Sequence, residues 1–328
     1  MSNISVSVII PVYNLECWIE KCIDSVFNQS FQNFEAIAVD DGSKDNSLSI
    51  LKRCKEKYGN RLKIIHQENA GQAVARNNAL NIARGEYIIF LDGDDYLDKD
   101  YIQRLIEKAE KDKLDCVVCG YERVDESGNV LQSIVPNVTN ELYQMKFLAV
   151  CSKIIRRSYL EEKHIRFPEG KLYEDVCFSW QVLYLSDKIG AIDYAGYKYL
   201  YRQGSSSNSK IKTEKLPLEE NRNVIEIVLE EVDKFGKRDL FEYSVMTQYT
   251  YLIFILARKN KLKIVKLLCN ETLAVMQQYF PKCTKNKYLK SEHCKRTIPM
   301  SQRLGVRVFL LGIRFKIIHL IAVVLTRV

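Results

Sequence analysis

The sequence predicts an α/β protein, in which a mostly parallel β-sheet flanked by helices is followed by a helical C-terminal extension. Two observations lead to this class. Over the first 120 residues, short apolar runs of strand character alternate with segments of helical periodicity, whereas residues 215–280 show helical periodicity alone. Each of the first four apolar runs also precedes a polar loop. Because ligands of parallel sheets bind beyond the carboxyl ends of the strands, these loops predict a single site.

The predicted strands and helices follow one another in a regular order. Strands are expected at 5–10, 34–39, 62–66 and 87–91, and a fifth begins in the segment DCVVCGY. The intervening helices are marked by apolar residues on one face, over 18–27, 46–58, 71–84 and 102–109. The polar loops are PVYN (11–14), DDGS (40–43), ENAGQ (68–72) and DGDD (92–95). None contains GxGxxG or GxxxxGKS, which argues against a Rossmann dinucleotide site and a P-loop.

The loop after the fourth strand is the most informative segment of the chain. An apolar run there ends in three carboxylates, Asp92, Asp94 and Asp95. Clustered like charges at the end of a buried strand are costly unless a cation lies beside them. A hard divalent ion bound through oxygen, together with a substrate phosphate, fits this need. A simple Asp-Gly turn would explain one or two of these acids but not all three.

Composition indicates an ordinary globular protein, with 47% hydrophobic and 27% charged residues among 328. Ten scattered cysteines suggest packing in a reducing cytosol and not a disulfide framework. Cys116 and Cys119 form a CxxC pair within a predicted strand, where core packing is favoured over a redox or zinc role. The N-terminus lacks a basic region followed by an apolar one, so no secretory signal is expected.

Positive charge is concentrated near the C-terminus. From Lys282 onward there are eleven Lys or Arg residues and one acid, whereas the preceding part has 38 basic and 40 acidic residues. This distribution argues against a nucleic-acid-binding core. Residues 281–300 are expected to form a basic linker. The segment 301–328, whose longest charge-free run is half of the ~20 residues needed to span a bilayer, predicts a basic amphipathic helix on a membrane surface. The alternative is a terminal helix that packs on the domain.

Five motifs occur in one order and spacing: SVIIPVYN, VDDGSKDNS, NAGQAVARNNAL, GEYIIFLDGDDYL and LYEDVCF. Together they resemble glycosyltransferase family 2, the inverting sugar transferases with the GT-A fold, over residues 1 to about 205. The resemblance implies a GT-A catalytic domain at 1–210, with a nucleotide-binding half at 1–120 and an acceptor half at 121–210. A helical extension would follow at 211–280, and the basic linker and membrane-surface helix at 281–328.

The resemblance implies a set of nucleotide-binding residues: Pro11, Val12, Tyr13, Asp41, Arg76, Asn77, Asp92 and Arg202. The first three would line the base and ribose. Asp41 would accept the uracil N3–H, while Asp40 holds its loop. Arg76 and Asn77 would flank the nucleotide, and the arginine suits bidentate phosphate or base contact. Arg202 would belong to a segment that closes over the diphosphate, with 204–209 allowing movement; a surface hairpin is the alternative.

The remaining motif positions imply the chemistry. Asp94, with Asp92, would hold Mg²⁺ or Mn²⁺ against the diphosphate, and Asp95 would support the site or contact the donor sugar. Asp175 would be the general base and Glu174 would orient it or bind acceptor hydroxyls. From spacing alone, Asp175 could equally be a helix N-cap.

These expectations combine into a function. The chain would transfer a hexose or N-acetylhexosamine from a UDP-sugar to a hydroxyl of a surface glycan, expected to be lipid-linked, at the cytoplasmic face of the cell membrane. No nucleic-acid partner is expected. The alternatives are a sugar-nucleotide nucleotidyltransferase, against which the lack of a Gly-rich basic loop after the first strand argues, and a catalytically inactive sugar-nucleotide-binding protein.

Overall fold

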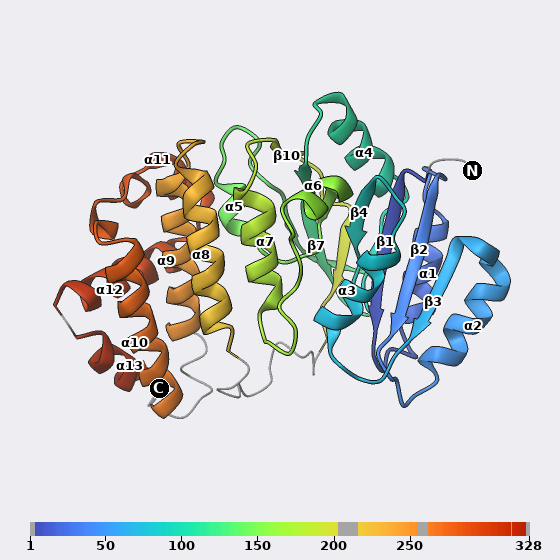
Figure 1. Cartoon of the computed structure of the whole chain (residues 1–328), viewed down its shortest axis with the longest axis horizontal. Helices are drawn as coiled ribbons and strands as arrows, with labels where there is room; N and C mark the ends of the chain where they lie inside the picture. The colour runs from blue at the N-terminus through green and yellow to red at the C-terminus, as the bar shows by residue number, and fades with distance from the viewer. Residues whose placement is uncertain (1–3, 203–215, 255–261, 316, 326–328) are drawn as a thin grey trace. The chain divides into compact units, whose positions relative to one another are not determined.

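The computed structural model describes residues 4–202, 216–254, 262–315 and 317–325. The chain forms two compact units, the first from 1–138 and 147–205 and the second from 139–146 and 206–328 (Figure 1). The residues 204–209, predicted to allow loop movement, and Arg327 of the predicted tail lie outside the described residues.

The main sheet of unit 1 has seven strands in the order β10-β6-β9-β4-β1-β2-β3. Their bounds are β1 Val6–Val12, β2 Phe34–Asp40, β3 Leu62–His66, β4 Tyr87–Phe90, β6 Cys116–Val118, β9 Lys153–Arg156 and β10 Ile189–Ala191. Every neighbouring pair is parallel except that β9 runs antiparallel to both β4 and β6. The predicted mostly parallel sheet is therefore confirmed, and β9 and β10 are additions to the predicted strands.

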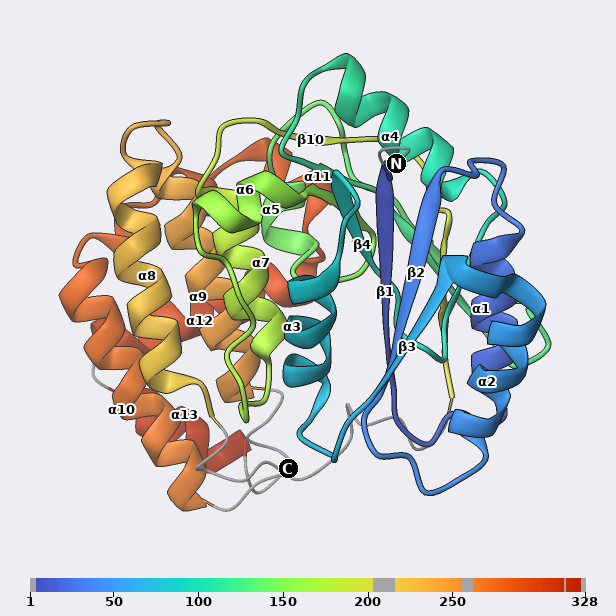
Figure 2. The ribbon, with the colours of Figure 1, turned by 45° about the vertical axis from the view of Figure 1, so that its right-hand side comes forward.

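Helices cover both faces of this sheet, as Figure 2 shows for α1 and α2 on one side of β1–β3 and α3 on the other. The helices of unit 1 are α1 Ile19–Phe27, α2 Ser47–Tyr58, α3 Gln72–Ile82, α4 Tyr101–Lys111, α6 Arg157–Glu162 and α7 Glu174–Tyr184. Alternate β1 residues such as Val6, Val8 and Ile10 share a core with α1, α2 and α4. Phe90, which faces the other way, packs edge-on against Phe178 of α7.

A second, four-stranded sheet in unit 1 has the order β5-β11-β7-β8. Its strands are β5 Tyr96–Leu97, β7 Tyr121–Val124, β8 Val130–Ile134 and β11 Tyr197–Leu200. β5 begins immediately after the DGDD loop, and β11 pairs with it and with β7. This small sheet therefore brings residues near 200 to the acidic loop.

Two glycines let loops and strands approach closely. A Cβ at Gly85 would lie 2.3 Å from the backbone nitrogen of Ser7. A Cβ at Gly93 would lie 2.8 Å from Leu15 Cδ1 and 3.0 Å from the carbonyl oxygen of Pro11. Any side chain at position 93 would push the acidic loop away from the end of β1.

Unit 2 is helical and includes the C-terminal segment. Its elements are α5 Tyr143–Lys146, α8 Leu218–Val232, α9 Arg238–Phe254, α10 Leu262–Tyr279, the 3₁₀ helices η5 Cys283–Lys285 and η6 Lys287–Leu289, α11 Glu292–Thr297, α12 Met300–Arg314 and α13 Ile318–Leu325. The predicted helical character of 215–280 is confirmed. Within the described residues, no helix is long and apolar enough to cross a membrane.

The segment 281–300 differs from the predicted linker because it consists largely of short helices. The buried Asn286 side chain fixes it by donating hydrogen bonds to the carbonyl oxygen of Asp239 and to Glu242 Oε1. Further on, α12 packs against α9 and α13 against α10. One face of α12 and one face of α13 thus pack on the helices of unit 2, as the alternative to a membrane-surface helix predicts.

All ten cysteines fall within the described part of the chain, and all are free thiols. Most are buried, including Cys116 and Cys119, and burial raises the pKa of both to about 12. Neither thiol is activated as a nucleophile or metal ligand. The prediction that they pack as small hydrophobic residues is confirmed.

Candidate active site

The loops that follow β1 and β2 are clasped to each other. The Asn14 amide donates to Ser43 Oγ at 3.0 Å, and the Lys44 amide donates to Asn14 Oδ1 at 2.8 Å. The Asp41 amide donates to the Val12 carbonyl at 2.8 Å. Asn14 adopts a left-handed φ of 53°, which asparagine tolerates. These contacts make the two loops one rigid edge of the site.

Of the three PVYN residues predicted to line a base and ribose, Tyr13 alone presents an exposed side chain. Tyr13 is 44% exposed, whereas Pro11 and Val12 are the buried last residues of β1. The Val12 side chain belongs to the core shared with α1. The Val12 side chain is thus buried against helices, and its predicted place beside the base and ribose stays a prediction.

The carboxylate of Asp41 fixes the loop before α3. It accepts the amides of Ala70 and Gly71 at 2.8 Å each and the Gln67 side-chain amide at 2.8 Å. Asp40 Oδ2 lies 2.7 Å from the imidazole Nδ1 of the last residue of β3. Holding a loop was predicted for Asp40, but Asp41 makes more loop contacts. About one of its four acceptor positions is left for a base N–H, so the uracil contact of Asp41 stays a prediction.

Arg76 on α3 joins two parts of the predicted site. Its Nη2 donates to Asp92 Oδ1 at 2.8 Å and its Nη1 to Glu174 Oε1 at 3.0 Å. Glu174 Oε1 also accepts from Gln72 Nε2 at 2.6 Å. Arg76 is 2% exposed, and its guanidinium lies over the ring of Phe167. This arginine holds the acidic loop and the first turn of α7 together, and its predicted phosphate or base contact stays a prediction.

Asn77 has a different role from the predicted one. Its Nδ2 donates to the Phe167 carbonyl and to Glu169 Oε1 at 3.0 Å each, and its Oδ1 accepts from the Phe167 amide at 3.1 Å. The side chain is buried, and both amide hydrogens are used. Asn77 thus anchors the segment that leads to α7, and its predicted place beside a nucleotide stays a prediction.

Arg202 lies on Asp94. Its Nη2 donates to Asp94 Oδ2 at 2.7 Å and its Nε to the same oxygen at 3.2 Å. Burial, and then the negative charge of Asp92, raise the pKa of Asp94, while Arg202 opposes this rise. The structure thus joins two predicted site residues that are 108 positions apart. Arg202 is partly exposed, so it can exchange its partner.

Asp95 fastens β11 to the acidic loop. Its Oδ2 accepts from the Tyr197 hydroxyl at 2.6 Å and its Oδ1 from the Leu200 amide at 2.8 Å. The Tyr197 oxygen accepts in turn from the Asp92 amide at 3.2 Å. Asp95 is 2% exposed, which agrees with a supporting role and excludes direct contact with a sugar in this conformation. Through β11, Asp95 sets the position of Arg202.

Asp175 lies in the first turn of α7, and Tyr173 takes the N-cap position with φ 58°. The structure therefore does not support the N-cap alternative for Asp175. Part of its side chain reaches solvent, but protein surrounds the carboxylate. Burial, and then the charge of Glu174, raise the pKa of Asp175 to about 7. A carboxyl group with this pKa can take up a proton near neutral pH.

The charge balance of the site fits a divalent cation. Within the described residues, three aspartates of the acidic loop, Glu174 and Asp175 outnumber the cations beside them, which are Arg76, Arg202 and, near Asp175, Lys153. A diphosphate would be repelled unless a cation accompanied it. Asp92 Oδ2 and Asp94 Oδ1 make no hydrogen bond to another described residue and could hold Mg²⁺ or Mn²⁺. Among the described residues, no group of three or more His, Cys, Asp or Glu side chains is arranged to hold an ion.

The sequence model of glycosyl transferase family 2 matches residues 7–173, about half of the chain. The chain belongs to this family. The matched residues include β1 from Ser7 onward, the clasped loops, the acidic loop and Arg76, and they end at the residue before Glu174. The predicted family and enzyme class are thereby confirmed: this is a family 2 glycosyltransferase domain.

Curated relatives agree with the family. The glycosyltransferase GlyA of Streptococcus pneumoniae serotype 4 is 33% identical over 228 residues, which cover 64% of this chain and 32% of GlyA. The uncharacterized glycosyltransferase EpsJ of Bacillus subtilis strain 168 is 34% identical over 222 residues, or 63% of each chain. The poly(ribitol-phosphate) beta-glucosyltransferase of Bacillus spizizenii is 34% identical over 61% of this chain. The chain spans between about a third and two thirds of the length of these relatives.

Solved structures confirm the predicted GT-A fold of the family 2 enzyme. S. aureus TarS 1–349 in complex with UDP-GlcNAc superposes with a TM-score of 0.74 at 24% identity, covering 94% of this chain and 92% of TarS 1–349. A mannosyltransferase of Pyrobaculum calidifontis, in complex with GDP-Man and Mn²⁺, gives 0.51 at 17% identity. At these identities the likeness concerns the fold alone.

Two functional positions are missing from the sequence prediction of this family 2 site. Gln72, which donates a hydrogen bond to Glu174, is the last residue of the predicted ENAGQ loop, so its position in a predicted site loop could have identified it as a site residue. Tyr197, which links Asp92 to Asp95, lies in a strand where alternating tyrosines suggest packing. Its role is visible only from the contact.

Proposed function

We propose that the chain is an inverting glycosyltransferase that moves a hexose or N-acetylhexosamine from a UDP-sugar to a hydroxyl group of a glycan acceptor. The observation that supports this most is the bridge from Arg76 to Asp92 and Glu174, which sets the acidic loop beside the carboxylate of Asp175. The structural neighbour TarS binds UDP-GlcNAc, which supports a UDP-sugar donor. The Bacillus spizizenii relative, named for glucosyl transfer to poly(ribitol phosphate), supports a surface-polymer acceptor.

On the donor side, Asp92 and Asp94 would hold Mg²⁺ or Mn²⁺ with the diphosphate. A bound ion neutralises the negative charge that develops on the departing diphosphate. Arg202 would leave Asp94 and donate its fork of N–H groups to a phosphate oxygen, since a guanidinium binds carboxylate and phosphate with the same geometry. Arg76 stays with Asp92 and Glu174, and thereby keeps the loop in place.

On the acceptor side, Asp175 takes the proton of the attacking hydroxyl. The hydroxyl oxygen bonds to the anomeric carbon while the bond from that carbon to the diphosphate oxygen breaks. A single displacement of this kind inverts the anomeric configuration. Burial, and then the negative charge of Glu174, raise the pKa of Asp175 to about 7, so that its ionised form can accept a proton near neutral pH.

A thermal-shift and turnover screen tests this function. The full chain is incubated with UDP-glucose, UDP-galactose and their N-acetyl forms, with Mn²⁺ or with EDTA. We expect stabilisation by UDP and Mn²⁺ together, lost with EDTA, and slow metal-dependent release of UDP from one donor. Asp175→Asn should abolish transfer and leave UDP affinity within a few fold. Binding of UDP-sugars without any turnover would indicate the inactive binding protein, and turnover of a nucleoside triphosphate would indicate a nucleotidyltransferase.

We further propose that the enzyme binds the cytoplasmic face of the membrane, where a lipid-linked acceptor is presented. The exposed apolar side chains of Leu304 and Leu311 on α12, and of Phe315 at its C-cap, support it. The exposed Arg307 and Arg314 lie beside them. An apolar stripe flanked by arginines is suited to an anionic lipid surface.

A further inference from the structure

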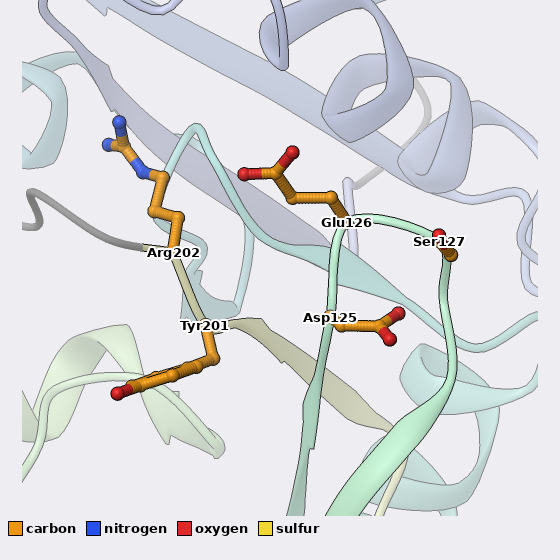
Figure 3. Close-up of a pocket in the computed structure, with 5 residues that line it drawn as sticks. All are labelled: Asp125, Glu126, Ser127, Tyr201 and Arg202. Carbon is orange, nitrogen blue, oxygen red and sulfur yellow. The ribbon is translucent and has the colours of Figure 1, made fainter.

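No cation contacts the carboxylate of Asp175 among the described residues, although three other acids of the site have one. Arg76 and Arg202 are bound to those acids, and Arg202 also lines a pocket with the β7–β8 turn (Figure 3). Asp175 Oδ1 accepts a hydrogen bond from the Val176 amide at 3.0 Å. A carboxylate surrounded by protein is costly to ionise unless positive charge lies near it. Asp175 therefore needs a cation from another element of unit 1.

Lys153 is the first residue of β9 and lies at the site edge of the main sheet. Because β9 runs antiparallel to β4 and β6, it begins where those two strands end, and its register with β4 continues to Phe90. The next residue, Ile154, packs in the core shared with α1 and α4. The Lys153 side chain therefore points to the other face, where Phe90 packs against Phe178 of α7. Asp175 lies three positions before Phe178, on the same side of α7.

The Lys153 side chain is buried and held by backbone carbonyls. It is 1% exposed, and its Nζ donates to the carbonyl oxygens of Ala149 and, at 3.4 Å, of Cys151. The loop that supplies them is itself fixed, because the Ser152 carbonyl accepts from the Cys119 amide at 2.9 Å. Carbonyl oxygens favour an ammonium, which has three donors and no acceptor. In the described part of the chain, no carboxylate contacts this ammonium, so its charge is not neutralised locally.

The charge that acts on Lys153 from α7 is that of Asp175. Burial lowers the pKa of Lys153, and the thiols of Cys116, Cys151 and Cys119 together with the carboxylate of Asp175 oppose this lowering. Burial raises the pKa of each thiol, to about 12 for Cys116 and Cys119, so the thiols are uncharged near neutral pH. Asp175 is thus the group among these four that carries negative charge in the working range of an enzyme.

We propose that Lys153 supplies the positive charge that keeps Asp175 ionised for its reaction with the acceptor hydroxyl. Two acids near Asp175, Glu174 and Asp92, disfavour its ionised form. Arg76 favours that form but is already bound to both of these acids. Lys153 does not touch a substrate and acts through Asp175, so the inference rests on the proposed function in taking Asp175 as the base.

The test follows the ionisation of Asp175 by ¹³C NMR in the full chain labelled at aspartate carboxyls, without substrates. Asp175→Asn identifies the resonance. Lys153→Gln removes the charge but keeps an N–H donor for the loop carbonyls, and it should raise the midpoint of the Asp175 titration by about one pH unit, a tenfold change in proton affinity. Lys153→Met should give the same shift with a further loss of stability. Lys63→Gln is the matched control, because it deprives buried Glu35 of a cation 2.7 Å away at the opposite edge of the sheet, and it should leave the Asp175 midpoint unchanged.

A second measurement needs no variant of the lysine. In the unaltered protein, the ¹⁵N resonance of Lys153 Nζ should shift as Asp175 titrates, and a resonance that does not respond would overturn the proposal. An Asp175 midpoint that stays constant or falls in folded Lys153→Gln would overturn it too, as would an equal rise in Lys63→Gln. In turnover, the acidic limb of the kcat/KM profile should move with the NMR midpoint, while the KM for the UDP-sugar stays the same. Because the NMR arm requires no turnover, failure to bind UDP would refute the proposed function separately from the charge pairing.

Discussion

Arg202 and Asp94 form a bidentate contact in which both Nε and Nη2 of the arginine reach one carboxylate oxygen. The arginine therefore occupies the side of Asp94 at which a bound metal ion is expected. Binding of the ion and diphosphate would therefore replace one ion pair with two others, Asp94 with the ion and Arg202 with a phosphate. Arg202 would then report on whether the donor is bound.

Replacing Arg202 with alanine should change the affinities for ion and nucleotide in opposite directions. Without its competitor, Asp94 should bind Mn²⁺ alone more tightly, whereas UDP in the presence of Mn²⁺ should bind about tenfold more weakly for lack of a charged phosphate contact. Isothermal titration measures both. Arg53→Ala, at an exposed arginine on α2, should leave both constants unchanged. A parallel loss of both affinities would show that Arg202 is only structural.

Arg76→Met should destabilise the fold strongly. The variant leaves Glu174, and in part Asp92, as uncompensated charges in a buried setting, which typically costs about 3–5 kcal/mol. Urea unfolding followed by circular dichroism gives the free energy of unfolding. Combining the change with Glu174→Gln should recover part of the loss, because one unpaired charge is removed. A decrease of less than about 1 kcal/mol in the free energy of unfolding would mean that the Arg76 ion pairs contribute no more than an exposed salt bridge does.

The raised pKa of Asp175 makes activity and stability depend on pH with opposite signs. As a base, Asp175 must be ionised, so kcat/KM should rise with pH through a pKa near 7. The native state retains the proton above the unfolded value of about 3.9, so the free energy of unfolding should fall as pH rises between about 4 and 7. Asp175→Asn should flatten both profiles. A pH-independent kcat/KM between pH 5 and 9 would argue against Asp175 as the base.

Tyr197→Phe should loosen β11. The variant deprives buried Asp95 of a hydroxyl donor and should cost about 1–3 kcal/mol of unfolding free energy. It should also weaken UDP binding, since β11 carries the chain into Arg202. Tyr96→Phe is the control for loss of a phenol hydroxyl, because Tyr96 lies on the paired strand β5 and its hydroxyl makes no hydrogen bond to another described residue. Equal effects of the two variants would contradict the assigned link.

The exposed stripe of α12 predicts membrane affinity. Leu311→Glu with Phe315→Glu should abolish co-sedimentation with vesicles that contain anionic lipid, because apolar burial and charge attraction are both reduced. Ile227→Glu, at an exposed apolar residue of α8, should have no effect. Activity on a water-soluble glycoside acceptor should be unchanged in the α12 variant. Equal binding of the unaltered protein to neutral and anionic vesicles would show that the arginines do not contribute to membrane affinity.

The sequence by itself determined the α/β class, the first four strands and the acidic loop. Each of these is local: strand periodicity, helical faces and the cluster Asp92, Asp94 and Asp95 lie within short windows. It also placed the polar loops at one edge, because parallel strands must end on the same side of a sheet.

The tertiary structure decided how the site residues pair. Arg76 with Glu174, Asp95 with Tyr197, and Arg202 with Asp94 are each separated by about 100 positions. The family resemblance places Arg76 and Asn77 beside a nucleotide, and the structure adds protein partners for both. A buried guanidinium or amide must satisfy its donors with whatever acceptors the fold brings near, and that neighbourhood is set by strand order, including the antiparallel β9, which no local pattern encodes.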